Sequence, residues 1–244
     1  MTADVHIYYS CTTIKKAYEN GLFALVADGV HKILPTQLGD QAQLYTIHGV
    51  CSNGHEIPLL YALTRAQRES TYELVFSCLE RELRSLGPQC VRRFVVDFER
   101  AAINAAKRTF PGINVEGCAF HLAQAWNRRR DALGLRKFIV GPDRCRRVAQ
   151  WWRTIKGLPF LRWDLFRRNP ALARPPVPRD HEAFQGCQQF LEYLHATWIR
   201  GPLKEMWCKW GITELRTTNL AEAYHRYFLT SKEDHPQLPP VLYI

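Results

Sequence analysis

The pattern of hydrophobic and polar positions in the first half of the chain predicts alternating strands and helices. The continuous apolar run over 22–27 predicts a strand buried on both faces. Two further strands are predicted over 43–50 and 56–63, joined by a hairpin turn at 52–54. Because these connections are short, we expect the three strands to be antiparallel neighbours.

A helical periodicity follows these strands. Ser70, with Glu73 three residues later, has the pattern of a capped helix start, and apolar residues keep helical spacing as far as Leu83. The next elements are a strand over 91–97, a helix through Lys107, a strand over 113–117 and a helix from Cys118. The resulting order of three strands, helix, strand, helix, strand and helix is typical of a mixed α/β sheet.

Two of the predicted strands end on an aspartate, Asp28 and Asp97. If these strands are adjacent and parallel, both carboxylates lie at one edge of the sheet. Hard cations such as Mg²⁺ prefer oxygen ligands of this kind. The alternative is that each aspartate only caps a helix or stabilises a turn. The pattern alone leaves both interpretations open.

The second half of the chain has a different composition, which is rich in tryptophan and arginine. All seven tryptophans lie at or beyond Trp126, and apolar residues keep helical spacing, which predicts a mainly helical subdomain. The proline-rich segment 174–179 cannot be helical and predicts a loop. We expect the tryptophans mostly to fill the core and the arginines mostly to be exposed and accessible to phosphate. The predicted DNA-binding residues are Arg128, Arg129, Arg130, Arg144, Arg146, Arg147 and Arg153.

Composition and charge narrow the class of protein. A content of 46% hydrophobic and 12% aromatic residues suits a packed globular protein. The net charge of +10 favours a polyanionic partner. No apolar run approaches the roughly 20 residues of a membrane span, and the first twenty residues lack the apolar core of a secretory signal. The eight scattered cysteines suit a reducing compartment better than a disulfide framework.

Two further groups of residues have both a chemical and a structural interpretation. Cys118 and His121 have a spacing that suits zinc, but a structural zinc site needs four ligands and the spacing implies no others. Cys145 and His225 are the only additional ligands we can suggest; a purely structural role for Cys118 and His121 is the alternative. Glu222, three residues after an asparagine, fits a capping box, and a third metal-binding carboxylate is the alternative.

Taken together, these segments resemble the transposase domain of Mutator-like elements (MULEs). The resemblance is carried by motifs such as Asp28-Gly29, Asp97-Phe98-Glu99-Arg100-Ala101, Cys118-x-x-His121 and Asn219-x-x-Glu222. Each motif is weak alone, but together they occur in the family's order. The resembling segments are 27–32 with Pro35, 43–49, 58–63, 97–101, 117–125 and 218–225.

The resemblance implies a ribonuclease-H-like core with a mixed five-stranded sheet, flanking helices and a helical insertion. It assigns Asp28, Asp97 and Glu222 as an Asp-Asp-Glu triad that binds two Mg²⁺ or Mn²⁺ ions. The implied activity is DNA transposition by phosphodiester cleavage and strand transfer in the nucleus, on transposon ends, by a homodimer or higher oligomer. Cys118 and His121 would then be structural or would organise DNA.

The domain division that follows has five parts. It comprises an N-terminal lead-in over 1–20, the first part of the core over 21–133, the Arg/Trp-rich insertion over 134–215, a returning catalytic helix over 216–232 and a tail over 233–244.

Two departures from the family pattern favour a second hypothesis. Val30-His31 replaces the last two residues of the family's Asp-Gly-Thr-Phe motif. Only about twenty residues precede the first predicted strand and the sequence ends abruptly, so we expect that the zinc-finger DNA-recognition module usual upstream in the family is missing and that the copy is truncated. The alternative function is therefore a truncated or domesticated transposase remnant that binds DNA or protein without catalysis. A zinc-stabilised fold around Cys118 and His121 is a third hypothesis.

Overall fold

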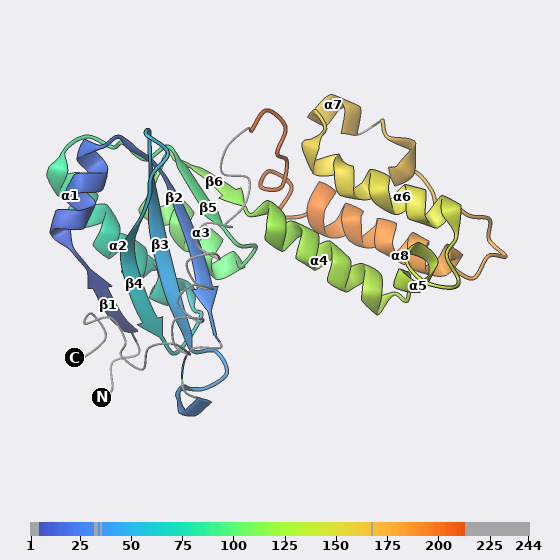
Figure 1. Ribbon diagram of the computed structural model, residues 1–244, viewed down its shortest axis with the longest axis horizontal. Coiled ribbons are helices and arrows are strands. Elements are labelled where there is room, and N and C mark those ends of the chain that lie inside the picture. The colour runs from blue at the N-terminus through green and yellow to red at the C-terminus, as the bar shows by residue number, and fades with distance from the viewer. Residues whose placement is uncertain (1–4, 32–33, 35, 167, 213–244) are drawn as a thin grey trace. The chain divides into compact units, whose positions relative to one another are not determined.

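The computed structural model describes residues 5–31, 34, 36–166 and 168–212 (Figure 1). These residues form two compact units, the first ending at Glu116 and the second beginning at Gly117. The described part of the predicted insertion, 134–212, falls within the second unit, together with the helix that precedes it. The predicted catalytic helix over 216–232 and the tail over 233–244 lie outside the described residues.

The first unit is built on one mixed sheet with the strand order β1-β4-β3-β2-β5-β6. β1, β4, β3 and β2 pair antiparallel in turn, whereas β2 and β5 pair parallel. The predicted antiparallel meander is therefore confirmed, and β2 and β5 have the parallel placement that the sequence left open. The strands are β1 (Val5–Tyr9), β2 (Leu22–Val30), β3 (Gln43–Cys51), β4 (Glu56–Thr64), β5 (Arg93–Val96) and β6 (Asn114–Gly117).

Among the described residues, the sheet has six strands rather than the five that the resemblance implies, because the predicted N-terminal lead-in is part of the fold. β1 pairs with β4 from Val5 opposite Thr64 to Tyr9 opposite Leu60. α1 (Cys11–Glu19) follows, and the Ser10 side chain caps it by accepting a hydrogen bond from the Thr13 amide. The segment has the β-branched and aromatic composition of a strand, but its 5 residues are too few to signal one clearly in the sequence.

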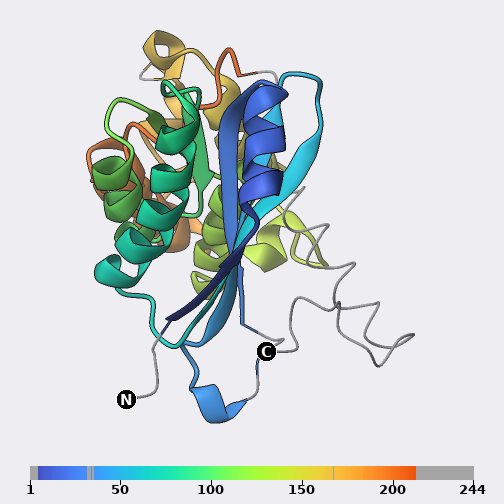
Figure 2. The same ribbon diagram turned by 90° about the vertical axis from the view of Figure 1, so that its left-hand side faces the viewer.

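In the described part of the first unit, the α-helices are α1, α2 (Glu69–Leu86) and α3 (Arg100–Thr109). α1 contacts α2, and α2 in turn contacts α3, so the three helices lie side by side along the sheet (Figure 2). The prediction that Ser70 caps α2 is wrong. Arg68 occupies the N-cap position without a side-chain hydrogen bond, and the helix already begins at Glu69.

An aromatic core joins the sheet to α2 and α3. Phe76 on α2 lies 5.1 Å from Phe94 of β5 and 6.1 Å from Tyr45 of β3, measured between ring centroids. Phe94 also meets Phe110, just after α3, at 5.6 Å. All four rings are buried. The face of the sheet that carries Tyr45 and Phe94 is therefore the face that α2 covers.

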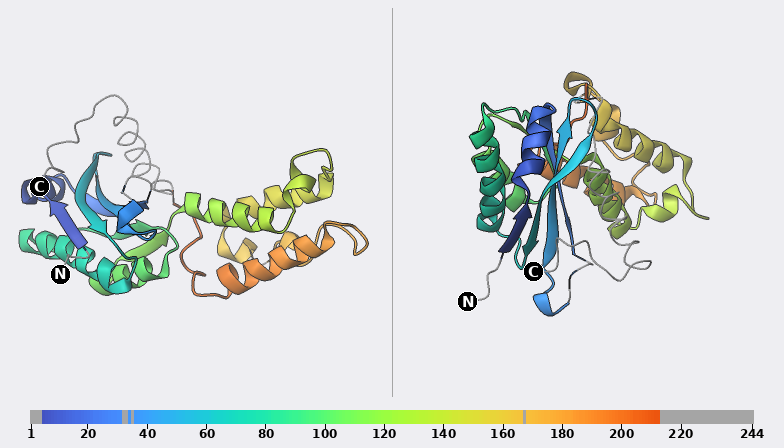
Figure 3. Two further views of the ribbon diagram at one scale, coloured as in Figure 1. Left: turned by 90° about the horizontal axis from the view of Figure 1, so that it is seen from below. Right: turned by 60° about the vertical axis from the view of Figure 1, so that its left-hand side comes forward.

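The second unit is helical, as the sequence predicts. In Figure 1 and Figure 3, α4, α6 and α8 run alongside one another. α8 continues directly into a π-helical turn, η4. Its elements are α4 (Ala119–Ala132), α5 (Arg136–Ile139), α6 (Arg146–Gly157), α7 (Trp163–Phe166), α8 (Phe184–Tyr193), η4 (Leu194–Ile199) and the short 3₁₀ turns η2 (Leu158–Phe160) and η3 (Pro170–Leu172).

The tryptophans hold this unit together. Trp151 and Trp152 on α6 both meet Phe190 on α8, with ring centroids 5.8 and 5.2 Å away. Trp126 on α4 packs against Trp198 and Trp207. The prediction that tryptophans mostly form core is confirmed, because five of the seven are buried: Trp126, Trp151, Trp152, Trp198 and Trp207. Trp210 is an exception, at 56% exposed.

All eight cysteines are free thiols, and their exposure ranges from buried to exposed. Burial raises the pKa of the Cys187 thiol to about 12, whereas Cys11 is exposed. Because the thiolate is the reactive form, we expect iodoacetamide at pH 8 to modify Cys11 and to leave Cys187 unmodified in the folded protein. Peptide mass spectrometry before and after denaturation measures this. Equal labelling of both thiols without denaturant would contradict the packing of α8.

Among the described helices, none is both long and apolar enough to cross a membrane.

Candidate carboxylate site and arginine surface

Asp28 lies near the end of β2, and Asp97 directly follows β5. The parallel register pairs Leu25 with Phe94 and Val26 with Val95. Continuing this register by two residues places Asp28 beside Asp97. Residues two apart on a strand share a face, so the two carboxylates lie in one row across adjacent strands.

The face on which this row lies follows from the neighbours of the two aspartates. Gly29 pairs with Tyr45, whose ring meets α2, so Asp28 lies on the opposite face of the sheet. Phe94 also meets α2, so Val95 lies on the opposite face, and Asp97 follows it two residues later. Asp28 is buried, with 7% of its surface exposed, and Asp97 is half-buried. The pair therefore occupies the sheet face opposite α2.

The turn after β5 holds Asp97 in place. The Glu99 amide donates a hydrogen bond of 3.1 Å to Oδ1 of Asp97. A carboxylate that accepts from the backbone two residues later forms a local turn that fixes the side-chain direction. Glu99 is the N-cap residue of α3, so the start of that helix and the orientation of Asp97 are set together.

Glu99 is a site residue that the sequence interpretation did not single out. Its Oε2 accepts a 2.6 Å hydrogen bond from the Tyr72 hydroxyl, which in turn accepts one of 2.7 Å from Nε2 of Gln43. Burial raises the pKa of the Glu99 carboxyl to about 7; the Tyr72 hydrogen bond opposes this shift and the charge of Asp97 adds to it. The only sequence signal was the position of Glu99 two residues after Asp97.

Tyr45 shows that several carboxylates gather at this end of the sheet. Burial raises the pKa of its hydroxyl well above the ordinary value, and the neighbouring Tyr72 hydroxyl adds to the shift. The negative charges of Asp97, Glu99 and Asp28 contribute further. Three acidic side chains from two neighbouring segments therefore act on one hydroxyl, and such a concentration of negative charge favours a cation.

The donor set fits a hard divalent cation, because Asp28 and Asp97 offer only carboxylate oxygens. Among the described residues, no group of three His, Cys, Asp or Glu side chains is arranged to hold a metal ion. The third predicted ligand, Glu222, lies outside the described residues. The described part of the site therefore contributes two carboxylates, and the assignment of Glu222 stays a prediction.

His31, which departs from the family motif, is held by groups other than Asp28 or Asp97. Its Nδ1 lies 3.0 Å from the Ala42 carbonyl oxygen, and its Nε2 lies 3.1 Å from Nε2 of Gln67. The ring is thus engaged on both nitrogens.

Cys118 and His121 lie at the start of α4 in the second unit. Cys118 is the N-cap residue, is fully buried and makes no side-chain capping bond. His121 is half-buried, and its ring meets that of Phe120. Cys145, a suggested zinc ligand, is the N-cap of α6. The described residues do not gather these side chains with a third ligand, and the other suggested ligand, His225, lies outside them.

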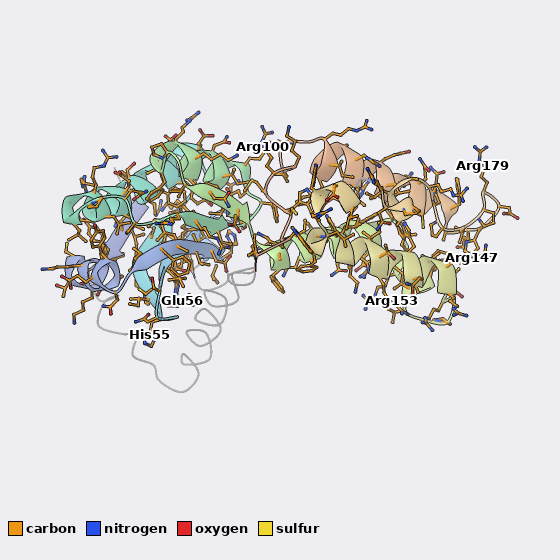
Figure 4. All side chains as sticks on the ribbon, turned by 90° about the horizontal axis from the view of Figure 1, so that it is seen from above. His55, Glu56, Arg100, Arg147, Arg153 and Arg179 are labelled. Carbon is orange, nitrogen blue, oxygen red and sulfur yellow. The ribbon has the colours of Figure 1, made fainter. Side chains whose placement is uncertain are left out.

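The predicted DNA-binding arginines fall into two groups. Arg130 is half-buried over the Trp152 ring at 5.1 Å and donates to Asp131, while Arg129 lies over the Tyr193 ring at 5.5 Å. These two make protein contacts that stabilise the helical unit. The others are exposed and form no ion pair with a described carboxylate: Arg128, Arg144, Arg146, Arg147 and Arg153. Arg147 and Arg153 extend outward from α6 in Figure 4.

A pocket of about 700 Å³ lies beside the first turns of α6. Arg146, Arg147 and Arg174 line it, together with Trp151 and the proline-rich segment 175–178. Among the described residues, no acidic side chain lines it, and the first turn of α6 has no acidic residue. Positive side chains near the N-terminus of a helix are unfavourable, because the helix dipole is positive there. A bound anion would relieve this repulsion. Arg174 was not among the predicted DNA-binding residues, because only the fold brings it to α6.

The two units thus define a class of protein. A mixed α/β domain carries two aspartates at the ends of adjacent parallel strands, and a basic helical unit follows it in the sequence. Residues 25–125 match the family model of the MULE transposase domain, which confirms the resemblance seen in the sequence. Over these residues the chain is therefore similar to the MULE transposase domain. The matched segment includes Asp28, Asp97, Cys118 and His121 and ends before Glu222. No curated protein matches the chain.

Proposed function

We propose that this chain is the catalytic domain of a DNA transposase with a ribonuclease-H-like core, acting in the nucleus. The observation that carries the proposal is the parallel register that places Asp28 beside Asp97 within the segment that matches the MULE transposase domain. Asp28, Asp97 and Glu222 would hold divalent Mg²⁺ or Mn²⁺. When bound, these ions supply Lewis-acid activation of the scissile phosphate and of the attacking hydroxyl.

The residues of the chain contribute orientation and charge. The buried Asp28 and the turn-held Asp97 present their carboxylates from a rigid sheet, which favours one arrangement of the ligands. The exposed arginines of the second unit suit the phosphate backbone of DNA, because arginine pairs with phosphate oxygens without reading base sequence. The domain would therefore bind DNA largely through its backbone.

Nicking of supercoiled plasmid DNA tests the proposal. The purified protein should convert supercoiled to open-circular DNA in Mg²⁺ or Mn²⁺ and should stop when EDTA is added. DNA binding without metal-dependent nicking would contradict the catalytic proposal and favour the non-catalytic binding module.

The arginine pocket gives a prediction of its own. Replacing Arg146, Arg147 and Arg174 together by glutamine should lower the salt dependence of duplex binding. If each arginine neutralises one phosphate, the slope of log K against log salt should fall by about 0.9 per arginine. Fluorescence anisotropy with a labelled duplex over a salt series measures the slope.

The matched control removes the same charge from arginines that already have partners. Arg84, Arg108 and Arg162 are ion-paired with Glu80, Glu73 and Asp164. Their triple glutamine variant should keep a slope close to that of the wild type. Equal losses in both triple variants would show that only net charge matters and that the pocket does not bind phosphate.

A further inference from the structure

Two consecutive hydrogen bonds, one buried and one part-buried, link three elements at the end of the sheet that carries the aspartates. Nε2 of Gln43 on β3 donates to the Tyr72 hydroxyl on α2 at 2.7 Å, and that hydroxyl donates to Oε2 of Glu99 at 2.6 Å. Tyr72 is fully buried, and Gln43 is 2% exposed. Buried polar groups are costly when they lose their partners. The Gln43, Tyr72 and Glu99 side chains therefore have one favoured arrangement.

The two ends of this hydrogen-bond network reach the two aspartates in different ways, through the Asp97 carboxylate at one end and through the backbone beside Asp28 at the other. At one end, the Glu99 amide donates to Oδ1 of Asp97. At the other end, Oε1 of Gln43 lies against Gly29, the residue after Asp28. A Cβ atom at Gly29 would lie only 2.1 Å from this oxygen. Gly29 must therefore lack a side chain for Gln43 to keep its position.

We propose that Gln43, Tyr72 and Glu99 are positioning residues that set the spacing of the Asp28 and Asp97 carboxylates for a divalent cation. The inference rests on the proposed function, in which these aspartates bind the ion. The three side chains lie on the α2 face of the sheet and act through the backbone, whereas the two aspartates lie on the other face. Side chains that orient metal ligands typically change metal affinity by about 10–100-fold when they are removed.

The same core offers a matched control for the tyrosine hydroxyl. Tyr45 is 2% exposed, and its ring lies 5.0 Å from that of Tyr72. Its hydroxyl has no hydrogen-bond partner among the described residues. Tyr45→Phe and Tyr72→Phe therefore remove the same atom from the same core, but only Tyr72→Phe breaks the hydrogen-bond network.

Calorimetric titration with Mn²⁺ tests the role of Tyr72. We expect Tyr72→Phe to weaken Mn²⁺ binding by about 10–100-fold and Tyr45→Phe to leave it unchanged. Thermal unfolding of each metal-free variant shows whether the fold is retained. In hydrogen–deuterium exchange without metal, the peptide containing residues 97–101 should exchange faster in Tyr72→Phe than in Tyr45→Phe.

Two variants of Glu99 separate positioning from direct ligation. Glu99→Gln keeps an oxygen that accepts from Tyr72, so it should retain most of the Mn²⁺ affinity, whereas Glu99→Ala should lose about as much as Tyr72→Phe. Equal losses in both Glu99 variants would indicate a direct carboxylate ligand and overturn the positioning role.

The outcomes also separate this inference from the proposed function. If Mn²⁺ binding depends on Asp28 but Tyr72→Phe binds as tightly as Tyr45→Phe, the positioning role is wrong and the proposed function stands. If the wild-type protein shows no Asp28-dependent binding of Mn²⁺, both are overturned.

Discussion

Replacement of Asp97 by asparagine should reduce metal-dependent nicking by roughly 1,000-fold or more. A bound metal supplies several kcal/mol of transition-state stabilisation, and each 1.36 kcal/mol is a factor of ten in rate. Asparagine preserves the size of the side chain and an acceptor for the Glu99 amide, so the turn after β5 should remain. The measurement is the rate of plasmid nicking at saturating Mg²⁺ or Mn²⁺.

The control for Asp97 is Asp40, an exposed aspartate of the same unit. Asp40→Asn makes the same chemical change away from the carboxylate pair and should nick at the wild-type rate. Melting temperatures of both variants should stay close to that of the wild type. Nicking that survives Asp97→Asn would remove this residue from the site.

The second large effect concerns stability. Phe94→Ala should lower the free energy of unfolding by about 3–5 kcal/mol, the usual range for removing a buried phenylalanine. Phe94 is fully buried between Phe76 and Phe110, so truncation opens a cavity where β5 meets α2 and α3. Urea unfolding followed by circular dichroism measures the change.

Leu74 provides the comparison for Phe94. It lies on α2 but is 51% exposed, so Leu74→Ala should change stability by no more than about 0.5 kcal/mol. A similar small change for Phe94→Ala would mean that β5 is not packed against α2, and the register of the two aspartates would then lose its support.

The sequence was sufficient to predict the elements with strong patterns. The apolar runs before Asp28 and Asp97 belong to β2 and β5, and these strands are parallel neighbours, an arrangement that the sequence left open. The tryptophan-rich half is helical because its apolar residues keep helical spacing. Such local periodicities reflect which face of an element is buried, so they are readable without coordinates.

Features that depend on distant residues could not be predicted in this way. The segment 5–9 is too short to signal an edge strand clearly, and it becomes one only by pairing with β4. Glu99 gains its role from Tyr72, and Arg174 joins Arg146 only after the chain folds back beside α6. Ser70 has the residue type of a cap, but the helix begins one residue before it. For the segment 5–9, Glu99 and Arg174, the residues that determine the structure lie far away in the sequence. For Ser70, the local pattern does not decide at which of two neighbouring positions the helix begins.

The binding of a divalent cation by Asp28, Asp97 and Glu222 stays a prediction, and the proposed function depends on it. Calorimetric titration of the metal-free protein with Mn²⁺ tests them most directly, using the wild type and the single variants Asp28→Asn, Asp97→Asn and Glu222→Gln. The account predicts that the wild type binds Mn²⁺ and that each of the three variants binds it much more weakly, whereas Asp40→Asn binds as the wild type does. Equal binding by the wild type and all three variants, or no binding by any of them, would contradict it.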